Sequence, residues 1–165
     1  MGSCKICKRF GIFLNVNKKG ICNACLQVAK IELPQRAKII EDSARLVTSA
    51  KKLETRLSRY NDLMTHAGYI FDKYEKNGVY PVTPKAESYL KQFGDKESKV
   101  VADWFSEKEV EADDKIKQAK TQKEKIKVLS KFVAEVQKYL SLYPSERLTE
   151  IFQRSQKLLT NLHLK

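Results

Sequence analysis

The chain has 165 residues, of which 42% are hydrophobic and 32% charged, and it carries a formal net charge of +12. This balance is typical of a folded protein with hydrated helices and excludes an intrinsically disordered chain. No apolar run reaches the roughly 18 residues of a membrane span, and basic residues interrupt the N-terminus where a secretory signal would be apolar. We therefore expect a cytoplasmic protein that contacts no membrane.

All the cysteines of the chain lie near its N-terminus in the pattern C-x2-C-x14-C-x2-C. They are Cys4, Cys7, Cys22 and Cys25. In a reducing compartment such a set is more often a group of metal ligands than two disulfides. Two residues between thiolates let both sulfurs turn toward one ion, and two such pairs complete the closed tetrahedron of structural zinc. We predict one structural Zn²⁺, with a rubredoxin-like iron site or reactive thiols as the alternatives.

The residues between the two cysteine pairs predict a small hairpin. Residues 12–16 alternate in polarity like a short strand, and Asn17–Gly20 is a turn sequence that leads into a second strand through Ile21. After Cys22 the pattern becomes helical, with Asn23 as the expected N-cap. The expected miniature core consists of Phe10, Ile12, Phe13, Leu14 and Ile21.

This order of knuckle, hairpin and knuckle at a helix start resembles treble-clef zinc fingers. The motif "CNAC" at Cys22–Cys25 resembles the second knuckle of GATA-type fingers. The resemblance is confined to the metal site and implies that zinc stabilises this segment. We accordingly divide the chain into a four-cysteine zinc finger over residues 1–33 and a helical bundle over residues 34–165.

The region after the finger has a helical heptad pattern. From Leu46 to Tyr74 apolar residues recur at alternating steps of four and three. A second apolar ridge is formed by Ile40, Val47, Leu63 and Ile70. We predict one long helix over about 35–77, with Pro34 in its first turn and Asn77-Gly78 as its left-handed cap.

Prolines and glycines divide the remainder of the chain. A corner is expected over 78–95, a second long helix over about 96–143 and a C-terminal helix over about 145–162, capped by Ser145. The predicted fold is mostly α: a small N-terminal treble-clef zinc finger followed by an elongated antiparallel helical hairpin or bundle with coiled-coil character. The alternative is that the heptad helices pair between two chains as a homodimer.

The positive charge is densest in the finger. Residues 1–33 contain six Lys or Arg residues and one Glu. Basic side chains beside aromatic ones suit phosphate contact and base stacking. The candidate nucleic-acid contacts are Lys5, Lys8, Arg9, Phe10, Phe13, Lys18 and Lys19.

Lysines also recur on the second long helix. The expected stripe consists of Lys117, Lys120, Lys127, Lys131 and Lys138. Because Glu124 and Glu135 lie in the same stripe, it is interpreted as a solvated helix face.

No enzyme is predicted. The two histidines, His66 and His163, are far apart in sequence, and no Gly-rich phosphate loop or nucleophile motif occurs. Two hypotheses remain: a nucleic-acid-binding or regulatory factor whose finger contacts phosphate, and a protein–protein interaction adaptor that uses the finger and the bundle.

Overall fold

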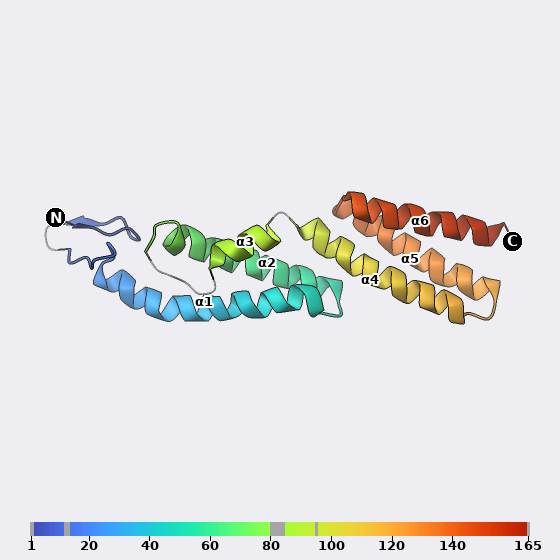
Figure 1. Ribbon diagram of the computed structural model, residues 1–165, viewed down its shortest axis with the longest axis horizontal. Helices are drawn as coiled ribbons and strands as arrows, with labels where there is room; N and C mark the ends of the chain where they lie inside the picture. Colours follow the sequence, from blue (N-terminus) through green and yellow to red (C-terminus); the bar gives the residue numbers. More distant parts are fainter. Residues whose placement is uncertain (1, 12–13, 80–84, 95, 165) are drawn as a thin grey trace. The chain divides into compact units, whose positions relative to one another are not determined.

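The structure is a computed structural model that describes residues 2–11, 14–79, 85–94 and 96–164 (Figure 1). The chain forms two compact units, Met1–Gly94 and Asp95–Lys165. Both units are built almost entirely from helices, which confirms the mostly α fold class.

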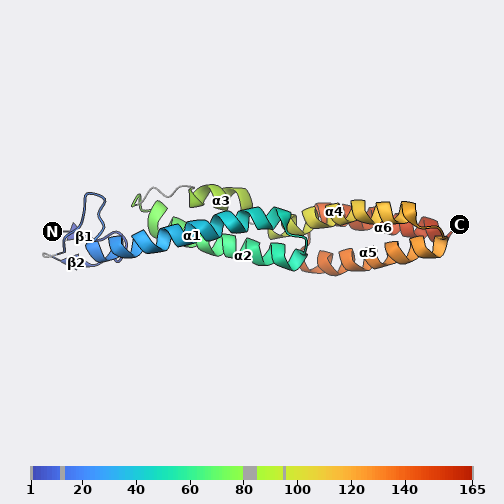
Figure 2. The same cartoon turned by 90° about the horizontal axis from the view of Figure 1, so that it is seen from below.

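The first unit is a helical hairpin with a short two-stranded sheet before it. Its elements are β1 (Gly2–Ser3), β2 (Phe10–Gly11), α1 (Asn23–Ser49), α2 (Leu53–Ile70), the π-helical turn η1 (Phe71–Glu75) and α3 (Ala86–Phe93). The strands are antiparallel, with Gly2 opposite Gly11. Helices α1 and α2 run side by side in both views, and α3 packs on α2 (Figures 1 and 2).

The single helix expected over 35–77 is two helices, because the chain turns at residues 50–52. Ala50 and Lys52 have extended backbones. The hydroxyl of Ser49 bonds back to the carbonyl of Arg45, an interaction that weakens the end of a helix. The buried Arg56 then donates from Nε to the free carbonyl of Ala50 at 2.7 Å, so that the turn is satisfied from the start of α2.

Pro34 lies inside α1 and not in the first turn of a helix, which corrects the expected start. The helix begins at Asn23, so the boundary expected after residue 33 falls in its interior. Pro34 has no N–H group to donate to the carbonyl of Lys30, four residues before it. Both residues lie on the exposed face of α1, so this carbonyl can bond to water instead and the proline is tolerated.

The core of the first unit confirms the second apolar ridge and half of the heptad seam. All four ridge residues are buried. The buried seam positions recur every seventh residue and are Leu53, Tyr60, Ala67 and Tyr74. The seam positions between them, such as Leu57 and Met64, are only half-buried, so the face that packs is centred on the ridge.

The end of η1, which continues α2, is fixed by two features of the corner region. Gly78 has a φ of +62°, which confirms it as the left-handed cap. The carboxylate of Glu75 accepts hydrogen bonds from the backbone N–H groups of Ala86, at 2.6 Å, and Glu87, at 3.0 Å. An anion at the free N–H groups of a helix start stabilises that helix, so Glu75 connects η1 to α3.

The second unit is a bundle of three helices. They are α4 (Glu97–Gln118), α5 (Gln122–Leu142) and α6 (Glu146–His163), and each packs on the other two. Their buried side chains include Val101, Phe105, Leu129, Val136, Leu148 and Ile151. Arg154 of α6 pairs with both carboxylate oxygens of Glu109 of α4, at 3.2 and 2.9 Å. Ser145 accepts from Leu148 N–H, which confirms the predicted cap of α6.

The second long helix expected over 96–143 is also divided. Thr121 and Glu124 form a capping box, with each side chain accepting from the other residue's backbone, and this starts α5. The expected stripe of five lysines on one helix is therefore wrong. Lys117 lies on α4, Lys120 lies between the helices, and only the other three share α5.

The antiparallel hairpins are formed by neighbouring helices, α1 with α2 and α4 with α5. Each of these hairpins lies within a single unit. Among the described helices, none is long and apolar enough to cross a membrane.

Candidate metal centre

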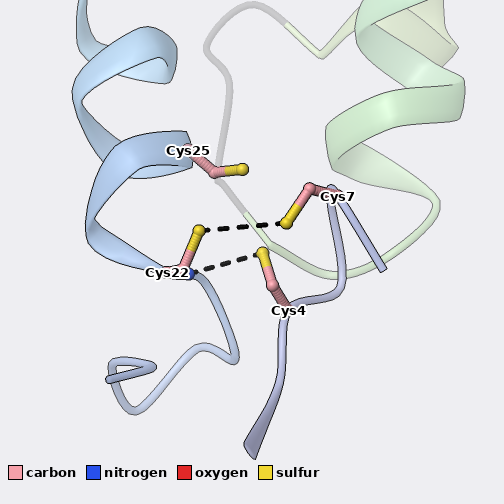
Figure 3. Close-up of side chains that lie close together, drawn as sticks. All are labelled: Cys4, Cys7, Cys22 and Cys25. Atoms are coloured by element: carbon pink, nitrogen blue, oxygen red, sulfur yellow. Dashed lines mark hydrogen bonds between the residues drawn. The ribbon is translucent and has the colours of Figure 1, made fainter. Parts of the chain in front are cut away.

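The first cysteine pair lies on the tight turn that joins β1 to β2. The N–H of Cys4 donates to the carbonyl of Arg9 at 3.0 Å, and the N–H of Lys8 donates to the carbonyl of Cys4 at 2.8 Å. Lys8 has a φ of +59° and is the only non-glycine residue with a positive φ in the described part of the chain. This turn places the sulfurs of Cys4 and Cys7 toward one point (Figure 3).

The second cysteine pair is delivered by a turn stabilised by Asn17. Its Oδ1 accepts from the N–H groups of Lys19, at 2.9 Å, and Ile21, at 3.1 Å. Gly20 has a φ of +78°, which a side chain would make costly. Of the predicted hairpin, the described residues show a single bridge between Val16 and Cys22. Residues 12 and 13 lie outside the described part.

Cys22 and Cys25 occupy the first turn of α1. The N-cap is Cys22 and not Asn23, which corrects the predicted cap by one residue. The side chain of Cys22 makes no capping bond. Its sulfur lies 3.9 Å from that of Cys7, so this position serves the cysteine cluster rather than the helix end.

The four cysteine sulfurs form one compact cluster (Figure 3). All four lie within 4.8 Å of one another, and none forms a disulfide. Four thiolates at about 2.3 Å from a tetrahedral zinc ion are separated from each other by roughly 3.8 Å. The observed spacing needs only a small contraction to hold one ion, so the cluster is positioned to bind a metal.

The surroundings of the four thiols are unequal. Burial raises the pKa of Cys4, but backbone N–H groups of Cys22, Cys7 and Ile6 donate to its sulfur and leave the pKa lowered. Burial raises the pKa of Cys25, and the neighbouring thiols raise it further. The thiol of Cys4 thus has a lower pKa than that of Cys25.

The cysteine cluster is packed into the core of the helical hairpin. Cys4, Ile21 and Cys22 are buried and belong to the same cluster of side chains as Leu33 and Tyr74. Phe10 was expected in a miniature core, but it is 68% exposed. The finger therefore uses the helices for most of its apolar packing, because its own residues are too few to bury one another.

The predicted nucleic-acid contacts that the structure describes are all exposed. They are Lys5, Lys8, Arg9, Phe10, Lys18 and Lys19. The aliphatic chain of Lys5 passes over Gly20, which brings it beside the turn that carries Lys18 and Lys19. Phe13 lies outside the described residues. The exposed cations thus come from both cysteine turns.

A polar network next to the metal centre was not predicted from the sequence. Glu32 of α1 accepts from Arg36 Nε at 3.1 Å and from Lys73 Nζ at 3.2 Å. Arg36 stacks over the ring of Tyr69, 3.7 Å from its centroid, and donates to Nδ1 of His66 at 2.8 Å. The Lys73 ammonium also bonds to the Tyr69 hydroxyl. These interactions join α1 to the end of α2 across about forty residues, a separation at which no sequence pattern points to pairing.

The network keeps both Lys73 and Glu32 charged. Burial opposes the charged form of Lys73, but hydrogen bonds with Tyr69 and Glu32 outweigh it and raise its pKa. Burial likewise opposes the charge on Glu32, and hydrogen bonds from Tyr69 and Lys73 hold its pKa below the usual value. Burial and the nearby Arg36 lower the pKa of His66, so the ring is a neutral acceptor at Nδ1.

No family model, curated protein or solved structure matches this chain.

Proposed function

We propose that the protein is a non-catalytic nucleic-acid-binding factor whose finger is stabilised by one Zn²⁺ and contacts the phosphate backbone. The helices would scaffold the finger. The single observation that carries this proposal is the charge around the cysteine cluster. Residues 1–31 contain six Lys or Arg residues and no Asp or Glu.

The donor set favours zinc. Four thiolates close the coordination shell and leave no position for substrate, which is the arrangement of structural zinc sites. Zinc, when bound, would supply folding free energy by joining the two cysteine turns. We assign the finger to the treble-clef type, in which the second pair of ligands lies at a helix start, as Cys22 and Cys25 do.

The arrangement of the cations supports phosphate contact. Arg9 and Lys8 follow the first cysteine pair, and Lys18 and Lys19 precede the second, so the exposed charges lie on both turns. A zinc ion with four thiolates carries about two negative charges, and the six basic residues of this segment outnumber them. A basic surface of this kind is the electrostatic footprint of a protein that binds a phosphate backbone.

A protein–protein adaptor is the second candidate function. Val28 and Ile31, on neighbouring turns of α1, are 50% and 66% exposed. Together with the exposed Phe10 they offer apolar area close to the metal centre, and such area is typical of protein interfaces. Nucleic acid is favoured because no carboxylate precedes Glu32 in the chain.

Fluorescence anisotropy with labelled single-stranded and duplex DNA and RNA tests the proposal. Zinc-loaded protein should bind, and the double variant Lys18→Glu/Lys19→Glu should bind at least tenfold more weakly, because two attractive interactions with phosphate become repulsive. The matched control is Lys127→Glu/Lys131→Glu, the same charge change on exposed positions of α5, which should bind like the wild type. An equal reduction of affinity in both variants would mean that the net charge of the protein, and not the position of these lysines, determines binding. It would overturn the role of the finger.

A further inference from the structure

A pocket of about 390 Å³ that is open to solvent, called the cavity below, lies against the metal centre. One wall is formed by the first cysteine turn with Ile6, a second by the start of α1 with Ala24 and Val28, and a third by η1 with Lys73 and Tyr74. The volume falls within the range of about 300–1,000 Å³ that small organic groups occupy in proteins. All of these walls belong to the first unit.

The lining of this cavity is mostly apolar, with cations but no carboxylate. Ile6, Ala24, Val28 and the ring of Tyr74 supply the apolar part. Arg9 and Lys73 supply the two positive charges. An apolar floor with a few fixed polar groups is the usual composition of a site for a planar organic ligand.

The charges of the surrounding groups approximately cancel inside the cavity and remain positive outside it. Cys7 and Cys25 also line the cavity, and a zinc ion with its four thiolates would carry about two negative charges there. Arg9 and Lys73 offset this charge. The carboxylate of Glu32, which pairs with Lys73, is also paired with Arg36, so the interior suits a neutral group. Lys8, in contrast, is exposed between the lining residues Cys7 and Arg9, and no carboxylate precedes Glu32 in the sequence, so the surface beside the cavity suits anions.

The third wall is held rigidly by the polar network. Glu32 accepts from Lys73 at 3.2 Å, and the Tyr74 hydroxyl lies 3.5 Å from the same carboxylate. Both lining residues are in the π-helical turn η1, a type of distortion that is frequent at functional sites. The network therefore presents the wall in one conformation before any ligand arrives.

We propose that this cavity accepts one unstacked nucleobase, and that the finger therefore recognises single-stranded rather than duplex nucleic acid. The inference rests on the proposed function and names its substrate class. A neutral base has the shape and polarity of the cavity, and the phosphates on either side of it would lie on the finger lysines. A base in a duplex is paired and stacked, so it cannot enter without a cost that a single strand does not meet.

The exposed Phe10 extends this mode of binding. It follows Arg9, which lines the cavity, and its ring is 68% exposed. An exposed ring beside a cation is the usual platform for a second base in proteins that bind single strands without sequence preference. Phe10 therefore suits the nucleotide next to the one in the cavity.

The test uses the full zinc-loaded chain and three labelled probes: an oligothymidylate, an abasic strand of the same length, and a duplex. The wild type should bind the oligothymidylate about tenfold more tightly than the abasic strand, because a stacked base contributes that order of affinity. Val28→Trp fills the cavity from an exposed position and should abolish the difference between these two probes. Ile31→Trp, the same change three residues farther along α1 and outside the cavity lining, should retain it.

The result with the abasic strand does not depend on any variant folding correctly. If the wild type binds abasic strand, oligothymidylate and duplex equally, the cavity takes no base and the inference is overturned. It is also overturned if Val28→Trp binds zinc and keeps the preference for bases. In both cases weaker binding by Lys18→Glu/Lys19→Glu would still support phosphate contact. If no probe binds, both proposals fail, and the cavity with its exposed neighbour Ile31 would be assigned to a protein ligand.

Discussion

The backbone N–H of Cys22 donates a hydrogen bond to Sγ of Cys4 at 3.4 Å, across eighteen residues of chain. This bond joins the two cysteine turns and gives the buried sulfur the character of a thiolate. Because Cys4 and Cys22 also belong to the core formed by α1 and α2, the metal centre and the helical hairpin should be stable or unstable together.

Removal of the metal should therefore destabilise the whole first unit and not only the finger. Cys7→Ser is the most informative change, because Cys7 is exposed and its replacement removes a ligand while changing the packing little. The variant should bind less than one equivalent of zinc, and its first unit should unfold at a lower temperature. The unfolding temperature of the Asp95–Lys165 unit should not change. Elemental analysis and circular dichroism measure both effects. A variant that keeps one equivalent of zinc would contradict the four-cysteine site.

Replacing Lys8 with glycine should stabilise the first unit. Lys8 holds a φ of +59°, a conformation that costs a non-glycine residue about 1 kcal/mol. Lys8→Gly should raise the free energy of unfolding in urea by a similar amount. Lys5→Gly removes the same charge at a position without a positive φ and should lower it. Equal effects of the two substitutions would mean that the turn is not strained.

Arg56 should determine the stability of the turn between α1 and α2. It is 5% exposed and bonds to the terminal carbonyl of Ala50, so Arg56→Met would leave that carbonyl without its charged donor. The free energy of unfolding should fall by about 2 kcal/mol. Arg45→Met, at a side chain that is 72% exposed, should change it by less than about 0.5 kcal/mol. A comparable decrease in the free energy of unfolding of both variants would contradict a specific role of the buried hydrogen bond in the turn.

The stability of the first unit should fall in mild acid because of Glu32. Its folded-state pKa lies below the unfolded value near 4.5, despite the opposing effect of burial, because Tyr69 and Lys73 hydrogen-bond to the carboxylate. Such a group stabilises the folded state above the unfolded pKa, and this contribution disappears as the pH falls through the folded pKa. The free energy of unfolding, measured by urea titration at pH values on both sides of 4.5, should fall more steeply with decreasing pH for the wild type than for Glu32→Gln. Parallel curves would contradict the assigned network.

The breaks in the two predicted long helices differ in how visible they are in the sequence. Thr121 and Glu124 have the spacing of a capping box, a local signal that could have placed the start of α5. The turn at residues 50–52 contains no glycine or proline, and the heptad pattern continues through it. The hydrogen bond from Arg56 to Ala50 that stabilises it exists only once α2 has folded back.

The metal site was more predictable than its surroundings. The spacing of the four cysteines is enough to predict that their sulfurs converge, because each pair lies within one turn. The pairing of Glu32 with Lys73 and the cavity beside it arise from packing of α1 against η1, which no local pattern encodes. Pro34 was misleading for a related reason, since its exposed position, and not its sequence neighbours, allows it inside α1.

The most direct test of phosphate contact by the finger is the salt dependence of binding. The logarithm of the association constant of zinc-loaded protein for oligothymidylate should fall linearly with the logarithm of salt concentration. In Lys18→Glu/Lys19→Glu the slope should be smaller in magnitude by about 1.4, because two lysines no longer neutralise phosphates of the single strand. In Lys127→Glu/Lys131→Glu it should equal that of the wild type. A slope that is the same in all three proteins, or affinity that does not depend on salt, would contradict the account.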